Sequence, residues 1–344
     1  MQFDPRNILV IHFGQLGDVV LGLPAFRAIR QRFPRARITA AVGKPANEVV
    51  AMSGYADEIY EVDRVSLRDG NKLISIGRII QFVRRVRQAR FDFVIDLHSL
   101  SETNLLGYLS GAPHRLYSRR PGRSLDYLAN FSPRPPLEEK SRHVADRYMD
   151  VLTSLDIQNA SRVPIIKTTP AGDFAVDALL KKEKAQSGEL LVGLFPGAGN
   201  PSRKWPLEHY AQLADHLIRN DRVRVLVFAG PEERDMVPHM RTLFPPSTVF
   251  FDRLTIPQLV SAQARLTVLI SNDTGPAHLA QAVGSPVIVI LDRPTPNSFV
   301  PRGEQHRVIL GPKIDEITVD EVYQAAHELL ALSRTDSLFY SEQH

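Results

Sequence analysis

Short β-branched runs alternate with longer helical patterns along this 344-residue chain, and the alternation occurs in two separate series. In the first, we expect strands at 7–13, 37–42 and 93–97, and helices ending near 33 and covering 74–90, 101–110 and 142–156. In the second, we expect strands at 190–195, 223–228, 267–270 and 286–291, and helices at about 207–219, 231–243, 255–264, 275–283 and 318–332. Such alternation predicts right-handed βαβ units, and hence an α/β protein with two doubly wound parallel-sheet domains. Their boundary is expected within 158–189, which includes the polar run KKEKAQSGE.

Two of the predicted helices have features of their own. Pro24 interrupts the first, so that helix is either kinked or restarted there. The helix at 74–90 has apolar residues at helical spacing, which predicts an amphipathic helix. The residues of this stripe are Ile76, Ile79, Ile80, Val83 and Val86.

Composition excludes several classes of protein. The chain has no cysteine, which rules out disulfides, thiolate metal sites and a cysteine nucleophile and fits a cytoplasmic protein. No apolar run reaches the roughly 18 residues of a membrane span. The N-terminus also lacks the basic start and cleavage site of a signal peptide.

Charge differs between the two halves. Residues 1–170 carry 25 Lys+Arg against 17 Asp+Glu, a net charge of +8, and the remainder carries 17 against 21, a net charge of −4. The basic half favours an acidic partner, and a solvated basic surface explains the charge equally well.

Ligands of open parallel sheets bind beyond the carboxyl ends of the strands, so the loops after the strands carry the candidate residues. The first such loop, FGQLGDVV, contains Gly14, Gly17 and Asp18. The glycines allow a tight turn, and Asp18 either caps the next helix or acts as a general base. Neither the G-x-G-x-x-G dinucleotide motif nor a G-x-x-x-x-G-K-[ST] phosphate loop is present.

A glycine-rich loop with basic residues follows the strand at 190–195. The segment FPGAGNPSRKWP places Gly197, Ser202, Arg203 and Lys204 after that strand and before the single tryptophan. Exposed backbone amides and two cations suit a phosphate group. An ordinary loop with solvated basic residues is the alternative.

The segment NDTGPAHLA follows the strand at 267–270. Thr274 can cap the next helix, Gly275 keeps the backbone accessible and Pro276 suits a first helical turn. A helix N-terminus at this edge of a sheet is an anion site, so the segment, with Asp273, is a candidate for a diphosphate. His278 lies one turn into the helix, where a single histidine is more often structural.

Two further loops contain candidate polar residues. In FAGPEERDM, Glu232 and Glu233 start a predicted helix, and one of them either offsets the helix dipole or accepts ribose hydroxyls. In the first half, His98 follows a strand, and a basic cluster after it could clamp an acidic acceptor or face solvent. The cluster consists of Arg115, Arg119, Arg120 and Arg123. No grouping of histidines and carboxylates has metal-ligand spacing.

Together these segments resemble glycosyltransferase family 9, the bacterial lipopolysaccharide heptosyltransferases. The matching segments are ILVIHFGQLGDVVLGLPAFRAIRQRFP, FDFVIDLHSL, LSGAPHRL, VGLFPGAGNPSRKWP, FAGPEER and NDTGPAHLAQAVGSPVIVIL. They occur in the family's order and spread over nearly the whole chain. The combination of LGDVV…LPA with NDTGPAHLA is specific at family level.

The resemblance implies a GT-B fold, in which two Rossmann-like domains face a cleft. Residues 1–170 would bind the acceptor, residues 171–344 the nucleotide sugar, and the last helix, at about 318–332, would cross back to the first domain. The family's donor is ADP-L-glycero-D-manno-heptose, a co-substrate, and no cofactor or metal is expected. The acceptor is a Kdo-bearing lipid A core, whose acidity matches the basic first half.

Residue roles also follow from the resemblance. Asp18 matches the general base of an inverting transfer. Asp273, Thr274, Gly275 and His278 match the donor-phosphate segment, and either Arg203 or Lys204 matches the basic residue before Trp-Pro. One glutamate of PEER would bind the ribose, with Gly197 and Ser202 also on the donor side. The acceptor side would consist of Gly17, His98, Arg119, Arg120 and Arg123.

One segment departs from the family pattern, and some alternatives stay open. LDRPTPNSFVPRG, from residue 291, replaces an FGPTDP-like loop near the donor, so donor identity is less constrained than the fold. The rival functions are transfer of another sugar or to another acceptor, a non-catalytic nucleotide-binding protein, and a nicotinamide-dependent oxidoreductase. We expect a cytoplasmic monomer without a nucleic-acid partner. A lipid acceptor is compatible with peripheral contact at the inner face of the membrane, although no sequence segment predicts it.

Overall fold

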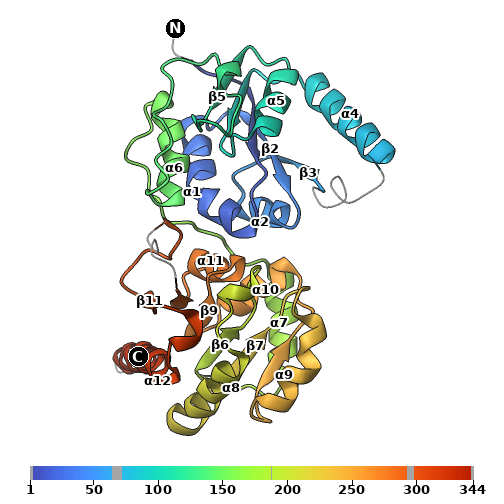
Figure 1. The fold of residues 1–344 in the computed structure, drawn as a ribbon. Coiled ribbons are helices and arrows are strands. Elements are labelled where there is room, and N and C mark those ends of the chain that lie inside the picture. Colours follow the sequence, from blue (N-terminus) through green and yellow to red (C-terminus); the bar gives the residue numbers. More distant parts are fainter. Residues whose placement is uncertain (1–2, 64–71, 187, 293–297, 342–344) are drawn as a thin grey trace. The chain divides into compact units, whose positions relative to one another are not determined.

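The structure, a computed structural model, describes residues 3–63, 72–186, 188–292 and 298–341 (Figure 1). Internal contacts divide the chain into two compact units, Met1–Ile165 (unit 1) and Ile166–His344 (unit 2). Each unit has its own parallel sheet. The predicted crossing of the last helix concerns the relation between the units and stays a prediction.

Unit 1 is a five-stranded sheet with helices between its strands. Its elements are β1 (Asn7–His12), α1 (Leu16–Arg32), β2 (Arg37–Gly43), α2 (Ala46–Ser53), β3 (Glu58–Val62), α4 (Lys72–Gln88), β4 (Phe93–Asp96), α5 (Ser101–Leu109), β5 (His114–Tyr117) and α6 (Val144–Val151). The strand order is β3-β2-β1-β4-β5, and every pairing is parallel. Helix α1 runs through Pro24 as one helix.

Unit 2 is a six-stranded parallel sheet. Its elements are α7 (Pro170–Lys182), β6 (Leu191–Phe195), α8 (Leu207–His216), β7 (Arg224–Phe228), α9 (Val237–Leu243), β8 (Val249–Phe251), α10 (Ile256–Gln263), β9 (Val268–Asn272), α11 (Gly275–Ala282), β10 (Val287–Leu291), β11 (Arg307–Leu310) and α12 (Val319–Ser341). The strand order β11-β10-β9-β6-β7-β8 is that of a Rossmann fold.

The interior strands match the prediction, and the unpredicted strands are all at sheet edges. β3 and β5 border the first sheet, and β8 and β11 border the second. Edge strands are short and bury less of their surface, so they lack the continuous apolar runs of interior strands. β11, for example, alternates half-buried and exposed residues, whereas β9 and β10 are buried throughout.

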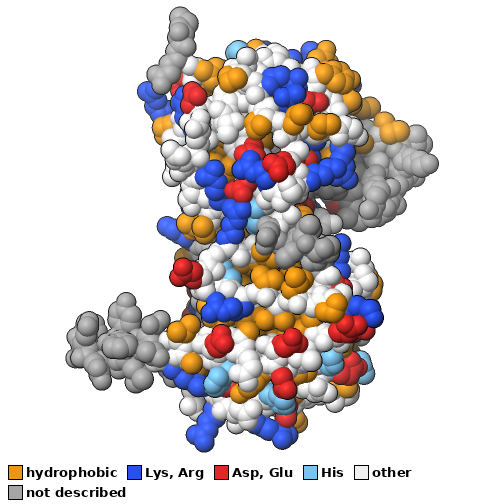
Figure 2. Space-filling view, turned by 60° about the vertical axis from the view of Figure 1, so that its left-hand side comes forward, with side chains coloured by type: hydrophobic (Ala, Val, Ile, Leu, Met, Phe, Trp, Pro, Cys, Tyr) orange, Lys and Arg blue, Asp and Glu red, His pale blue; other side chains and the backbone are white. Residues whose placement is uncertain are grey.

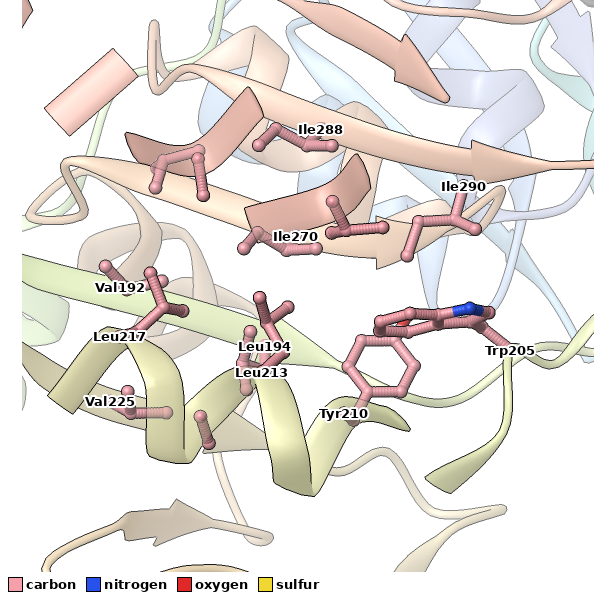
Figure 3. Close-up of a cluster of buried hydrophobic side chains, with 14 of the residues drawn as sticks. Val192, Leu194, Trp205, Tyr210, Leu213, Leu217, Val225, Ile270, Ile288 and Ile290 are labelled. Atoms are coloured by element: carbon pink, nitrogen blue, oxygen red, sulfur yellow. The ribbon is translucent and has the colours of Figure 1, made fainter. Parts of the chain in front are cut away.

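A large apolar cluster covers one face of the second sheet (Figure 3). Alternate residues of β6, β9 and β10 point into it, and α8 and α12 supply its other side. Trp205 and Tyr210 lie within it, with ring centroids 4.8 Å apart at 78°. Because the loop before α8 is anchored by this buried tryptophan, its position at the end of the sheet is fixed by packing.

Two searches of the described residues gave negative results. Among them, no helix is both long enough and apolar enough to cross a membrane. Within the same part of the chain, no group of three or more His, Asp or Glu side chains is arranged to hold a metal ion.

Candidate functional site

Both sheets reverse their winding direction beside the first strand of the unit. In unit 1 the reversal lies between β1 and β4, and in unit 2 it lies between β6 and β9. Loops that leave such neighbouring strands diverge and open a crevice, where doubly wound sheets bind ligands. The loops after these four strands are the ones that contain most of the predicted site residues. The topology therefore brings them together in pairs, one pair in each unit.

Asn272, at the end of β9, ties together the loops at the switch point of unit 2. Its buried side chain accepts a hydrogen bond from the Trp205 amide through Oδ1 (3.0 Å) and donates through Nδ2 to the carbonyl oxygens of Pro196 and Gly197 (both 3.1 Å). The Trp205 indole donates to the carbonyl oxygen of Ile317 (2.8 Å). These bonds fix the ends of the 196–205 loop against β9. Asn272 is not among the predicted site residues, although a polar residue ending an apolar strand is a usable signal.

Glu233 lies against the backbone of Gly197 in the same crevice. Its Oε2 accepts a hydrogen bond from the Gly230 amide (3.1 Å), and its Oε1 lies 3.9 Å from Nζ of Lys204. Burial raises the pKa of Glu233, and the Lys204 ammonium partly opposes this shift. A Cβ added at Gly197 would lie 2.5 Å from Cδ of Glu233, so the close approach requires glycine.

The sequence did not distinguish Glu232 from Glu233 or Arg203 from Lys204, and the structure does so by their burial. Glu233 is buried and Lys204 half-buried beside it, whereas Glu232 and Arg203 are exposed. The prediction of a helix starting at 231 is wrong, because a 3-10 turn at Arg234–Met236 precedes α9. Glu233 therefore faces the crevice from the loop before the helix.

Thr274 occupies the N-cap position of α11. The prediction that its side chain caps the helix is wrong, because the side chain makes no capping hydrogen bond. Its hydroxyl instead lies 3.0 Å from the hydroxyl of Ser271 on β9. The helix begins at Gly275, and its first-turn backbone leaves N–H groups for a ligand. Ser202, in the loop between β6 and α8, is exposed, and its hydroxyl donates to Oδ1 of Asn200 (3.0 Å).

Asp273 and His278 lie side by side at the start of α11. Nε2 of His278 is 3.7 Å from Oδ1 of Asp273, and their side chains are 5% and 16% exposed. The structure thus brings both predicted residues to the helix N-terminus.

Asp18 lies in the first turn of α1, beyond the end of β1. Its Oδ2 accepts a hydrogen bond from the Gln15 amide (3.1 Å), so the capping role suggested by the local pattern is present. This bond uses one of about four acceptor positions of the carboxylate, which leaves capacity to accept a proton. Gly17 precedes Asp18 in the same turn, and a Cβ added at Gly14 would lie 2.6 Å from Cβ of Asp18.

Three rings cover the switch point of unit 1. His12, at the end of β1, is fully buried and stacks on His98, with centroids 5.7 Å apart at 14°. Tyr148 contacts the same His12 ring edge-on at 4.7 Å. Nδ1 of His12 accepts a hydrogen bond from the Gly14 amide (3.2 Å), and burial beside His98 lowers its pKa well below the ordinary value. His98 is a predicted site residue, whereas His12 and Tyr148 are not.

A partly buried group of charges supports His98. Arg120 donates to the carbonyl oxygen of His98 (2.6 Å) and to Glu138 (2.9 Å), and Arg147 donates to the other oxygen of Glu138 (3.1 Å). None of the three side chains is more than 15% exposed. Such a group is screened little by salt, so it keeps Arg120 beside His98.

The predicted arginine cluster does not form a single clamp. Arg119 donates to the carbonyl oxygen of Pro135 (3.5 Å), and Arg123 is exposed. Arg115 donates to the carbonyl oxygens of Leu128 and Ala112. Of the predicted arginines, the structure therefore ties Arg120 to the crevice through His98.

Asp96, at the end of β4, organises the loop that carries His98. It is fully buried and accepts hydrogen bonds from the Ser99 amide and from Nδ2 of Asn104 (both 2.7 Å). Burial raises the pKa of Asp96 to about 7. Ser99 has a φ of 46°, in the left-handed region, so Asp96 holds a strained turn directly after His98. The sequence-based assignments omit Asp96.

Known proteins share this arrangement of motifs. The family model for glycosyltransferase family 9 (heptosyltransferase) matches residues 79–325, more than half of the chain. The chain is 22% identical over 318 residues to lipooligosaccharide heptosyltransferase 2 of Haemophilus influenzae, and the match covers 88% of each protein.

Solved structures extend the likeness to the fold. The glycosyl transferase family 9 protein of Veillonella parvula superposes with a TM-score of 0.83 at 22% identity, over 96% of this chain and 99% of that one. ADP-heptose lps heptosyltransferase II of E. coli superposes with a TM-score of 0.79 at 20% identity, over 95% and 99%. The GT-B fold predicted from the sequence is thereby confirmed. The chain belongs to glycosyltransferase family 9 and is a glycosyltransferase.

Proposed function

We propose that this chain transfers a heptose from an ADP-heptose-type donor to a lipopolysaccharide inner-core acceptor, with inversion at the anomeric carbon. The family supports a heptosyl transfer, and the E. coli protein with the same fold is an ADP-heptose lps heptosyltransferase. The observation that carries the proposal is the pair of switch-point crevices. Unit 2 offers a helix N-terminus and the Lys204 ammonium, which suit a nucleotide diphosphate, and unit 1 offers a carboxylate suited to proton abstraction.

The donor would bind at the crevice of unit 2. The amides at the start of α11 and the Thr274 hydroxyl would bind the diphosphate, because a helix N-terminus attracts anions. Lys204 would add its positive charge, and Gly197 gives the ligand access to the backbone beside it. The buried carboxylate of Glu233 would accept ribose hydroxyls.

The remaining donor-side residues would complete the cradle. Gly275 allows the diphosphate to approach the first turn of α11, and Ser202 offers a hydroxyl from the loop before α8. Asp273 would orient the His278 ring at the start of α11, where the diphosphate would bind.

Asp18 would act as the general base at the crevice of unit 1. Its free lone pairs would accept the proton of an acceptor hydroxyl as that oxygen forms a bond to the anomeric carbon. The bond between that carbon and the diphosphate oxygen breaks in the same step, and the nucleoside diphosphate leaves with its electron pair. The amides of α11 and Lys204 would stabilise this leaving charge.

The acceptor would bind beside Asp18. Gly17 leaves room at the first turn of α1, and His98 and the tethered Arg120 would meet anionic groups of the acceptor. Arg119 and Arg123 would contact its outer part. We propose a monomer that works in the cytoplasm, at the inner face of the membrane that holds the lipid-linked acceptor.

The decisive experiment is thermal unfolding with ADP-heptose, ADP and UDP-N-acetylglucosamine, followed by transfer to a heptose-deficient lipopolysaccharide core monitored by mass spectrometry. A ligand at about 100 times its Kd stabilises the native state by ~2.7 kcal/mol, which gives a clear rise in Tm. We expect this rise with the two adenosine compounds and a mass increase of one heptose.

Matched variants test the donor cradle in the same assay. Lys204→Ala should weaken ADP binding about tenfold, and Arg203→Ala, at the exposed neighbour, should leave it within about twofold. Stabilisation by a different nucleotide sugar alone would overturn the donor assignment. Binding without any transfer would favour a non-catalytic nucleotide-binding protein.

A further inference from the structure

Helix α4 packs on unit 1 through only part of its surface. Val86 is fully buried in a core cluster, and Phe82, Val83 and Ala89 pack against that cluster. Phe82, Val83 and Val86 lie in the C-terminal half of α4, and Ala89 directly follows the helix. In Figure 1 the helix lies at the rim of the unit and its N-terminal half extends away from the sheet.

The N-terminal half of α4 exposes isoleucines. Ile76, Ile79 and Ile80 are 54%, 47% and 46% exposed, and Ile74 is 56% exposed. Residues spaced by three and four lie on one face of a helix, so Ile76, Ile79 and Ile80 form a continuous apolar face. Scattered exposed apolar residues are common, but a contiguous group of β-branched residues on one helix marks an interaction surface.

All charged residues of α4 are basic, and one of them, Arg85, is offset by an ion pair with Glu58 (3.2 Å). The helix contains five basic residues and no acidic residue: Lys72, Arg78, Arg84, Arg85 and Arg87. Unit 1 as a whole has 24 Lys+Arg against 17 Asp+Glu, and Figure 2 shows both kinds of charged side chain on one face of it. An apolar helix face bordered by basic residues is typical of helices that lie in the headgroup region of anionic membranes.

The neighbouring helix α5 contacts the C-terminal end of α4 and exposes apolar side chains of its own. Nη1 of Arg87 donates to the carbonyl oxygen of Leu109 (3.3 Å), which ties the two helices together. Leu105 and Tyr108 of α5 are 44% and 49% exposed, and Arg115 lies over the Tyr108 ring at 5.5 Å. A tyrosine beside an arginine suits the interface between headgroups and acyl chains.

We propose that the Ile76, Ile79 and Ile80 face of α4, with its arginines, docks unit 1 on a bilayer that contains anionic lipid. The positive charge favours such a bilayer over a second copy of this chain, whose corresponding surface would repel it. The inference rests on the proposed function in one respect: the bilayer is taken to be the one that holds the lipid-linked acceptor.

Vesicle co-sedimentation of the full chain tests the proposal. We expect binding to vesicles of phosphatidylglycerol and phosphatidylethanolamine, and little binding to phosphatidylcholine vesicles. About 0.5 M NaCl should weaken the binding, because it screens exposed charges. The triple change Ile76→Ser, Ile79→Ser and Ile80→Ser should lower the partition coefficient at least about tenfold. Arg84→Gln should lower it about fivefold.

The control variant is Phe174→Ser, on α7, because Phe174 is 79% exposed and lies in unit 2. It should bind vesicles like the unchanged chain. Equal binding by the triple variant, or a wild-type chain that ignores the vesicles, would overturn the proposal. If light scattering instead shows a dimer that the triple variant abolishes, the face is a contact between copies. ADP binding measured without lipid tests the proposed function, and vesicle binding tests the α4 surface. Either result can be negative while the other is positive, so the two proposals are distinguishable.

Discussion

The two units place their candidate residues at the same topological point but connect the strands there differently. In unit 2 the ends of β6 and β9 are joined by the neutral amide of Asn272. In unit 1 the ends of β1 and β4 are covered by the stacked imidazoles of His12 and His98, with Asp18 and Arg120 nearby.

This difference separates binding from chemistry. A neutral amide clamp holds backbone groups in place at any ordinary pH, which suits a ligand that is already anionic. A group of titratable side chains responds to pH and to its neighbours, which suits a proton transfer. The same fold therefore supports two kinds of site through the residues at its strand ends.

The largest expected effect is on Asp18. Asp18→Asn should lower kcat by ~10²–10⁴, because asparagine cannot accept the proton. The unfolding free energy should stay near the wild-type value, since the asparagine oxygen can still accept the Gln15 amide. The measurement is turnover by mass spectrometry together with the Kd of ADP. Near-full turnover in a folded variant would remove Asp18 from the proposed chemistry.

Asn272→Ala should break the clamp of unit 2. It leaves the buried Trp205 amide and the carbonyl oxygens of Pro196 and Gly197 without this partner, so we expect a loss of about 4 kcal/mol in unfolding free energy. Chemical denaturation at pH 6 and pH 8 should give the same loss, since the clamp is neutral. The exposed Asn159→Ala serves as the control, with a change below about 0.5 kcal/mol. A loss that varies strongly with pH would contradict the claim that the Asn272 clamp, unlike the side chains at the strand ends of unit 1, does not depend on titratable groups.

Asp96 should make unit 1 sensitive to pH. Its native pKa is about 7 against an ordinary 3.8, so the native state binds the extra proton between these values. Unfolding free energy should therefore fall as pH rises through this window, by about 4 kcal/mol from this residue, and the cost is fully present above pH 7. Asp96→Asn should lack this contribution, so its stability relative to wild type should rise with pH. Parallel pH profiles in denaturant unfolding would contradict the assignment.

The smallest effect compares two glycines of one loop. Gly197→Ala adds a Cβ 2.5 Å from Cδ of Glu233, which must then shift, and we expect donor Kd to rise about tenfold. Gly199→Ala meets no atom within 4 Å and should leave Kd within about twofold. Calorimetric titration with ADP measures both. Equal affinities would show that the approach of Gly197 to Glu233 does not shape the donor site.

Much of the site followed from the sequence because it lies directly after strands. The loops that contain Asp18, Lys204 and Thr274 were identified from their position after apolar runs, and the family and the GT-B fold are confirmed. The edge strands and the residues that bridge two loops were not identified. His12 and Asn272 act through partners on distant segments, and no local pattern encodes those pairings. Asp96 bonds to Ser99 and Asn104, which are close to it in sequence, and only burial in the fold sets it apart from other loop aspartates.

The two α/β series, the family and the order of the site segments can all be read from the sequence alone. Hydrophobic periodicity and the glycines and prolines that end each element are local properties of the chain. Only the tertiary structure shows which neighbour is buried: Glu233 rather than Glu232, and Lys204, half-buried beside it, rather than the exposed Arg203. The tertiary structure also determines which residues of the apolar stripe on α4 are buried. Spacing alone makes Ile76, Ile79, Ile80, Val83 and Val86 one face, yet only Val86 is fully buried. Whether an apolar face meets a core or is left exposed depends on where the helix lies on its sheet, and helical periodicity contains no information about that position.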